Sequence, residues 1–214
     1  MTLDEMYDEL DLYGFDDFED SQKLTLLNEA YFDIVTREPW PFMEKVTPIT
    51  VNSGVSQITN NASVSPQITD LGSVLSFIDT TNDVVMMPER GDVIEKNYRV
   101  NDTSSYPDRY YFVGNELFVY PATIGSTSYR LFYTRTPSAA TTTSDTFLIP
   151  SRHHSIIVYG ALVKSFLVND DPQAAAFQNM FEQRYQQMRN DVWIKQYDRT
   201  DRIHVLTDSY DWNY

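Results

Sequence analysis

The sequence of 214 residues contains no cysteine. This absence excludes disulfides, thiolate nucleophiles and metal sites with Cys ligands. Glycine is also scarce, with 7 residues, and there is no phosphate-binding glycine loop, no G-x-S-x-G nucleophile elbow and no H-E-x-x-H zinc motif. The common signatures of nucleotide-binding and hydrolytic enzymes are therefore missing.

Long hydrophobic runs are missing too. A helix needs roughly 20 apolar residues to cross a bilayer. The best candidate, "SIIVYGALVKSFLV" at residues 155–168, is interrupted by Lys164 and is expected to form a buried helix. The start, "MTLDEMYDEL", contains no base and is not expected to act as a signal peptide. We expect no membrane partner.

Positive charge is in short supply, because 16 Lys and Arg face 31 Asp and Glu, which gives a net charge of −15. A protein that grips DNA neutralises phosphates with Lys and Arg, so firm nucleic-acid binding is not expected. Residues 1–20 carry many of the acids and no base. This segment is either an ordinary solvated face or a surface from which nucleic acid is repelled. Its candidate residues are Asp4, Glu5, Asp8, Glu9, Asp11, Asp16 and Asp17.

Titratable side chains form no recognisable catalytic set. Adjacent pairs such as Asp170-Asp171 are expected by chance among so many carboxylates, and this pair lies at a predicted helix start, where negative charge is favourable. His153 and His154 are neighbours, so they lie about 100° apart on a helix and cannot share a metal through i,i+4 geometry. We expect a protein that is not an enzyme, with no catalytic residue, no metal and no cofactor.

Helical periodicity dominates residues 1–44 and returns at residues 150–197. In the first segment a short acidic helix is expected to end at Gly14, and Ser21 is expected to cap a second helix. In the last segment an apolar helix is expected in the middle of a bundle, and a second helix follows, capped at Asp171-Pro172. The buried stripe of that second helix is Phe177, Phe181, Tyr185, Met188 and Val192.

Residues 45–149 are predicted to form an inserted antiparallel β domain. Pro48 marks "KVTPITV" as an edge strand. Strands at 109–113 and 116–120 flank a Gly-Asn hairpin signature, and a third strand at about 127–135 is expected to complete a three-stranded meander. Its many tyrosines are expected to pack across strands rather than to offer a stacking platform for bases.

Two features lie outside these patterns. Trp40 and Phe42, set beside Pro39 and Pro41, follow the first helical segment and are expected to join the bundle to the β domain. Residues 198–214 show neither period and are expected to form an extended arm that docks on another protein. The candidate contact residues of this arm are Ile203, Val205, Leu206, Tyr210, Trp212 and Tyr214. The expected fold class is α+β: a helical bundle formed by the N- and C-terminal helices, an inserted antiparallel β domain and an extended C-terminal arm.

The order of these signals resembles a known family. The segments are "LLNEAYFDIVTREPWPFMEK", "YYFVGNELFVYPA", "YRLFYTRTP" and "FLIPSRHHSIIVYGALVKSFLV" with the helix that follows. The most specific parts are the N-E-A-Y helix leading to W-P-F, the G-N-x-L-x-V-Y-P hairpin and the P-x-x-x-H helix. Over about residues 20–195 this order resembles the head–tail adaptor proteins of tailed bacteriophages, also called connector or neck proteins.

The resemblance implies a structural role. Members of this family form a ring, commonly of twelve subunits, on the portal at the head–tail junction of the virion. The ring extends the DNA channel and docks the tail or further neck proteins, while the duplex passes without specific binding. In several members the C-terminal segment reaches along the portal, which would explain an arm at residues 198–214.

Other functions stay open from the sequence. A tail-completion or stopper protein of the neck would sit on the adaptor instead of the portal, although the helical bundle argues against it. A carbohydrate- or peptide-binding module is suggested by the tyrosine-rich strands. An enzyme, such as a two-carboxylate glycosidase, would need a pair of acids that the sequence does not identify.

Overall fold

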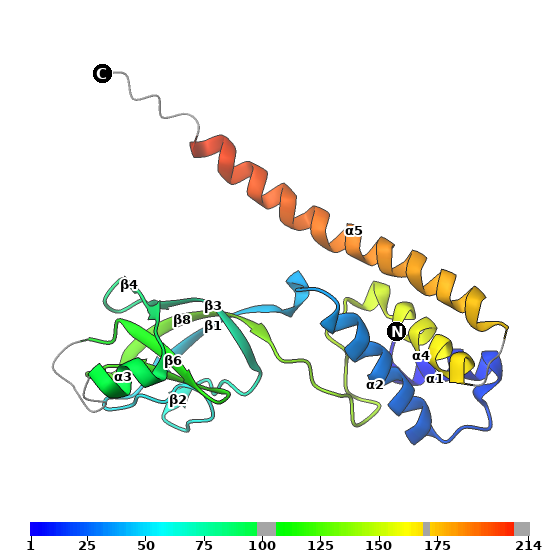
Figure 1. Cartoon of the computed structure of the whole chain (residues 1–214), viewed down its shortest axis with the longest axis horizontal. Helices are drawn as coiled ribbons and strands as arrows, with labels where there is room; N and C mark the ends of the chain where they lie inside the picture. Colours follow the sequence, from blue (N-terminus) through cyan, green and yellow to red (C-terminus); the bar gives the residue numbers. More distant parts are fainter. Residues whose placement is uncertain (98–105, 169–171, 208–214) are drawn as a thin grey trace. The chain divides into compact units, whose positions relative to one another are not determined.

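The computed structural model describes residues 1–97, 106–168 and 172–207, which form two compact units (Figure 1). The helical unit comprises Met1–Phe42 and Pro137–Tyr214, and the β unit comprises Met43–Thr136. The expected α+β class, in which N- and C-terminal helices pack together and a β region is inserted between them, is confirmed. Residues 137–149, which we had assigned to the β domain, cluster with the helical unit.

The helical unit is built around one apolar helix. Its helices are α1 (Leu3–Leu10), α2 (Asp20–Thr36), α4 (Ser155–Val168) and α5 (Ala174–Thr207). Every residue from 156 to 163 is buried, and α4 packs against the other three helices (Figure 1). A helix that is apolar around its whole circumference requires such cover, so the predicted middle position is confirmed.

Capping residues set the ends of the first two helices. Thr2 caps α1: its hydroxyl accepts from the Glu5 amide at 3.2 Å, while the Glu5 carboxylate accepts from the Thr2 amide at 2.8 Å. Gly14 has a φ of +90°, as expected for a glycine that ends a helical segment. The predicted Ser21 cap is wrong, because α2 begins earlier, where the Glu19 amide donates to the Gln22 side chain at 2.9 Å.

Helix α5 is longer than the sequence analysis expected. It runs as a helix to Thr207. The prediction of an extended arm is therefore wrong for residues 198–207. Residues 173–214 contain neither proline nor glycine, so no residue in that segment breaks the helix. Residues 208–214, the rest of the predicted arm, lie outside the described residues. Asp171, which was predicted to cap this helix together with Pro172, lies outside them as well.

The β unit contains two sheets. The first has the order β2-β1-β8-β3-β4 and the second the order β5-β6-β7. The strands of the first sheet are β1 (Glu44–Val51), β2 (Val64–Ser65), β3 (Leu71–Asp79), β4 (Val84–Val85) and β8 (Thr127–Arg135). The second sheet consists of β5 (Met87–Pro88), β6 (Arg109–Val113) and β7 (Glu116–Tyr120), and the short helix α3 (Gly91–Asn97) packs on it.

The predicted hairpin is present, but the meander is not. Strands β6 and β7 pair around Gly114, which has a φ of +61°. Strand β8, however, pairs with β1 and β3 in the other sheet. It has nine residues and finds long partner strands on both of its edges, whereas β7 has five. Between β1 and β3, more backbone N–H and C=O groups of β8 form hydrogen bonds than would do so beside β7. This favours the central position of β8 in the first sheet.

Side chains from both sheets share one core. Tyr129, Leu131 and Tyr133 of β8 point inward and meet Leu117 and Val119 of β7. The alternating pattern of β8 therefore predicted the buried face correctly, although it could not identify the pairing partners. Pro48 is tolerated because β2 pairs only with the last two residues of β1, which leaves the rest of that strand on the sheet edge.

Gly160 provides a test of the helical packing. A Cβ at this position would lie 3.0 Å from the Cβ of Ala30 on α2 and 3.2 Å from the ring of Phe181 on α5. We expect Gly160→Val to lower the free energy of unfolding by about 1–3 kcal/mol, because neither neighbour can move far in a packed core. Chemical denaturation followed by circular dichroism measures the change. Ala175→Val, on the exposed side of α5, is the control, and equal effects of both variants would contradict the close packing.

Candidate functional site

The part of the chain that the structure describes contains no candidate metal centre. Among those residues, no group of three or more His, Asp or Glu is placed to hold a metal ion. The helices described are all too short or too polar to span a membrane. His154 serves the fold instead: its two ring nitrogens lie 2.8 Å from the carbonyl oxygens of Met1 and Ile149. The candidate sites are therefore surfaces.

The acidic candidates divide into structural and exposed groups. Asp11 pairs with the buried ammonium of Lys23, with 2.5 Å between Oδ1 and Nζ, and hydrogen bonding to that carboxylate raises the Lys23 pKa. Glu5 belongs to the cap of α1. Glu9 is half-buried, and burial raises its pKa, an effect that Arg184 partly opposes.

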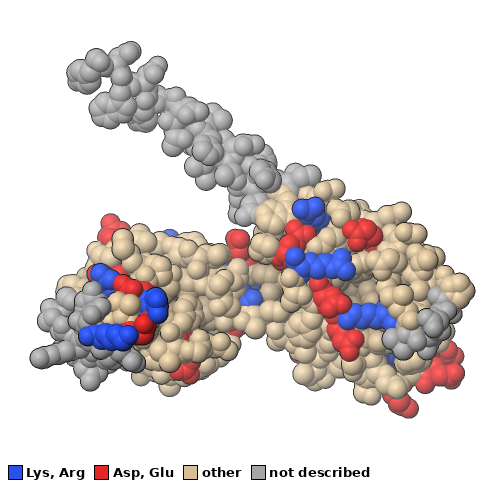
Figure 2. Space-filling model, viewed as in Figure 1, with Lys and Arg blue, Asp and Glu red and all other residues tan. Residues whose placement is uncertain are grey.

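The other four acidic candidates are exposed. They are Asp4, Asp8, Asp16 and Asp17. Elsewhere on the helical unit, acidic and basic side chains alternate on the face shown in Figure 2. Ion pairs of this unit include Lys164–Asp33 at 2.8 Å and Arg37–Glu182 at 3.9 Å. Exposed pairs of this kind contribute about 0–1 kcal/mol each. The four unpaired positions of the N-terminal segment are thus the best candidates for a surface of net negative charge.

The tryptophan between the two prolines is a core residue. Trp40 is 1% exposed, and its indole N–H donates to the Ile34 carbonyl at 2.9 Å. Its ring stacks on Phe42 at 5.4 Å and meets Tyr185 of α5 edge-on at 5.6 Å. These contacts all lie within the helical unit, whose first segment ends at Phe42. The proposed role of Trp40 and Phe42 as the junction to the β unit stays a prediction.

Sequence analysis missed a cluster around Glu38, defined here as Glu38, Tyr185, Arg189 and Trp193. The Tyr185 hydroxyl donates to one carboxylate oxygen at 2.5 Å, and the Trp193 indole N–H and the Arg189 guanidinium lie 3.3 Å from the other. The three partners are spaced four residues apart on one face of α5. That spacing is visible in the sequence, but it does not show that Glu38, which is distant along the chain, is the shared partner.

This cluster shifts the titration of Tyr185. Burial raises the pKa of its hydroxyl, and the hydrogen bond to Glu38 and the nearby negative charge raise it further. Arg37 lies over the same ring, with 5.1 Å from its Cζ to the ring centroid, and also over Phe181 at 4.9 Å. The carboxylate, the guanidinium groups and the rings together attach α5 to the end of α2.

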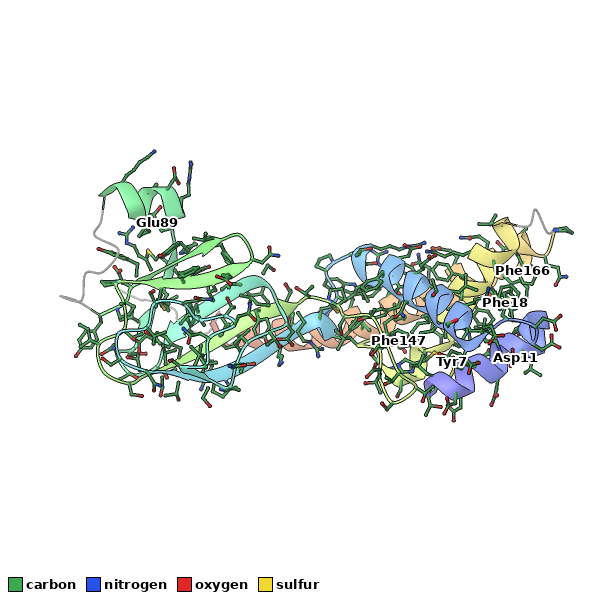
Figure 3. All side chains as sticks on the ribbon, turned by 90° about the horizontal axis from the view of Figure 1, so that it is seen from below. Tyr7, Asp11, Phe18, Glu89, Phe147 and Phe166 are labelled. Atoms are coloured by element: carbon green, nitrogen blue, oxygen red, sulfur yellow. The ribbon has the colours of Figure 1, made fainter. Side chains whose placement is uncertain are left out.

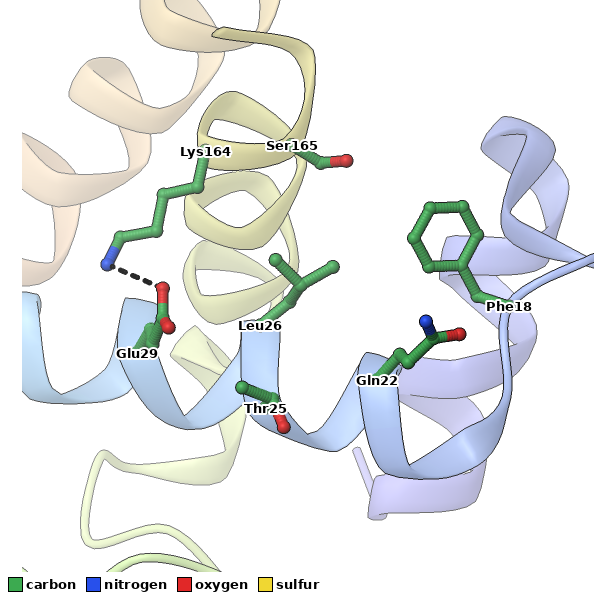
Figure 4. Close-up of a pocket in the computed structure, with 7 residues that line it drawn as sticks. All are labelled: Phe18, Gln22, Thr25, Leu26, Glu29, Lys164 and Ser165. Atoms are coloured by element: carbon green, nitrogen blue, oxygen red, sulfur yellow. Dashed lines mark hydrogen bonds and ion pairs between the residues drawn. The ribbon is translucent and has the colours of Figure 1, made fainter. Parts of the chain in front are cut away.

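A largely apolar hollow of about 390 Å³ lies between α2 and α4 (Figure 4). Its lining comes from Phe18, Gln22, Thr25, Leu26, Glu29, Lys164 and Ser165. The ring of Phe15 contacts the rings of Phe18 and Phe166, at centroid distances of 4.9 and 5.8 Å. Figure 3 labels Phe18 and Phe166 in the helical unit. Of the apolar side chains that line the hollow, Leu26 and Phe18 are only partly buried. The helical unit therefore has a concave surface suited to an apolar contact.

The expected arm residues are only partly described. Ile203, Val205 and Leu206 lie within α5, whose backbone is helical at these positions. Tyr210, Trp212 and Tyr214 lie outside the described residues. The tyrosines of the β unit are better defined: Tyr110, Tyr129 and Tyr133 are buried in its core, so they pack across strands as predicted and do not form an exposed stacking platform.

Comparison with known proteins gives one family. The family model described as SU10 adaptor protein matches residues 1–205. The match extends beyond the segment of resemblance noted from the sequence, about residues 20–195, to the acidic first residues and to residues 196–205 of α5. No curated protein matches the chain.

The raised pKa of the Tyr185 hydroxyl predicts that the folded chain loses stability at alkaline pH. Because its pKa is raised in the folded chain, the folded state keeps a proton that the unfolded chain releases near pH 10. The free energy of unfolding should therefore fall as the pH rises above about 10. In Tyr185→Phe the fall should be shallower by up to about 1.4 kcal/mol per pH unit.

Urea denaturation between pH 8 and 11 measures this slope. Tyr106→Phe, at an exposed tyrosine, is the matched control and should keep the slope of the unchanged chain. If both variants lose the same part of the slope, the Glu38 cluster does not protect the Tyr185 proton.

Proposed function

Since this chain belongs to the SU10 adaptor protein family, a family of phage head–tail adaptors, we propose that it forms a ring at the head–tail junction of a tailed phage. Membership makes it a structural adaptor of the phage and a component of the virion, and it points away from enzymatic activity. The proposed ring, commonly of twelve copies, binds the portal protein, extends the DNA channel and docks the tail or further neck proteins.

The match over residues 1–205, together with a helical unit made from both chain ends, is the observation that carries this proposal. The helical unit has the features of an assembly domain. It has its own packed core and a concave apolar surface beside Leu26. Copies that associate through such a surface remove apolar area from water, which stabilises the contact by about 25 cal/mol per Å².

We propose that the exposed acids Asp4, Asp8, Asp16 and Asp17 border the channel or the tail-facing surface. A duplex has to pass through the ring without being held. Side chains that repel phosphate prevent the multiple Lys and Arg contacts that give tight DNA binding. The support for this placement is the exposure of these four residues and the lack of any Lys or Arg among residues 1–20.

The C-terminal part of α5 and the residues beyond it are proposed to contact the portal or a neighbouring subunit. Residues 198–214 contain six large apolar or aromatic residues in an otherwise polar segment. A helix that continues to Thr207 offers a stiffer element for this contact than an extended arm would, although it spans less distance per residue. The candidate residues stay Ile203, Val205, Leu206, Tyr210, Trp212 and Tyr214.

Electron microscopy of the purified chain, alone and with its portal, tests the ring. We expect a closed ring on the portal, with the four exposed acids on its inner wall or its tail-facing surface. A chain that stays monomeric with the portal present would contradict the ring. A ring that carries all four acids on its outer wall would contradict the channel placement and leave the adaptor role intact.

Removal of residues 198–214 tests the C-terminal contact. The buried stripe of α5 ends at Val192 among the residues whose side chains are described, so the shortened chain should keep the fold of the helical unit. Thermal melting checks this, and co-sedimentation with the portal measures binding, which we expect to be lost. Normal assembly of the shortened chain on portals would refute the proposed role of this segment.

A further inference from the structure

Two arginines of this acidic chain share a small polar hollow in the helical unit. The hollow has a volume of about 160 Å³ and lies between the start of α4 and the middle of α5. Its lining residues are Arg152, His153, Ser155, Arg184, Gln187 and Asp191. Two guanidinium groups and one carboxylate give this place a formal charge of +1, in a chain whose net charge is −15.

The contacts within the hollow leave donor capacity on both arginines. The Arg152 Nε–H donates to His153 Nε2 at 2.9 Å, and Arg184 Nη1 donates to the Gln187 side chain at 3.3 Å. Each guanidinium has five N–H donors, and these bonds use one of each. Among the described residues, therefore, most of the donors at this place are not used by the fold.

His153 is held in its neutral form. Its side chain is 7% exposed, and burial, followed by the charge of Arg152, lowers its pKa. The hydrogen bond from Arg152 also requires that Nε2 accept and so carry no proton. A negative group that enters the hollow would raise the pKa of His153 again, because an opposite charge favours the imidazolium.

We propose that this hollow binds one compact oxyanion, a phosphate or a carboxylate. Guanidinium groups bind these two groups through short, charge-assisted hydrogen bonds, often in pairs. A hollow of about 160 Å³ has room for several waters, and therefore for one such head group.

Asp191 is the competitor for the same donors. Its Oδ2 lies 3.4 Å from His153 Nε2 and 3.9 Å from Arg152 Nε. Both distances are longer than the 2.7–2.9 Å or so of a direct charge-assisted bond. Asp191 thus lowers the positive charge of the hollow without accepting the hydrogen bonds of the arginines. An incoming oxyanion has to overcome only the repulsion from the Asp191 carboxylate. Removing this carboxylate should strengthen anion binding.

The test titrates inorganic phosphate into the full chain, with chloride at the same ionic strength as the reference. The imidazole carbon-bound proton shifts of His153 and the melting temperature report binding. We expect a saturable effect in the unchanged chain, with affinity roughly tenfold lower in Arg152→Gln and in Arg184→Gln, because each loses a charge-assisted bond worth about one power of ten.

Two further variants distinguish phosphate binding in the hollow from a general effect of the net charge of the chain. Arg90→Gln removes an arginine of equal charge from the β unit and should leave phosphate affinity unchanged. Asp191→Asn keeps the shape of the side chain and should bind phosphate more tightly. The proposal is overturned if the Arg152 and Arg184 variants bind as the unchanged chain does, or if Asp191→Asn weakens binding.

The source of the anion is decided by sedimentation of the assembled chain in phosphate and in chloride. If phosphate releases copies from the assembly, the natural occupant is a carboxylate of a second copy, and the site then deepens the proposed ring. If assembly is unaffected while His153 still responds, the occupant is a free or nucleic-acid phosphate. Both results support the site, and failure of the ring itself would leave the phosphate titration unchanged.

Discussion

Burial of residues 156–163 of α4 is the constraint on which the rest of the structure depends. An apolar helix of this kind needs neighbours on all sides, and the chain supplies α1 and α2 before the β unit and α5 after it. The two ends of the chain therefore have to meet. The β unit becomes an insertion with a separate core, as its own cluster of buried side chains shows. Gly160 marks the tightest point, where α2 and α5 approach α4 from two directions.

Local patterns predicted the elements better than their partners. The stripe of α5 and the alternation of Tyr129, Leu131 and Tyr133 depend on spacing within one element, and both faces were predicted correctly. The meander was wrong because pairing of β8 with β1 joins residues about 80 positions apart, and no local signal encodes it. The Glu38 cluster was missed for the same reason, since Glu38 and Tyr185 are separated by 147 positions. For the candidate site, the sequence identified the acidic and apolar residues but could not predict how they are arranged in space.

Several of the scarce bases have a structural task. Lys23 binds Asp11, Lys45 binds Asp70, and Arg109 binds Glu89, and each pair joins segments that are distant in the sequence. A buried ammonium such as Lys23 would be costly to leave without its carboxylate, so this pair fixes how the turn after α1 lies on α2. Bases paired in this way with carboxylates are less available to neutralise phosphates.

The surplus acids then determine how copies can associate. With a charge of −15 on each chain, like-charged surfaces repel, and the repulsion extends over the Debye length of about 8 Å at physiological salt. In the proposed ring, contacts between copies would therefore have to be apolar, as the surface beside Leu26 allows, or locally positive, as the hollow between Arg152 and Arg184 allows. An apolar contact strengthens as salt screens the repulsion, whereas a contact between a carboxylate and a guanidinium weakens. The sign of the salt dependence of assembly therefore distinguishes which of the two kinds of surface holds neighbouring copies together.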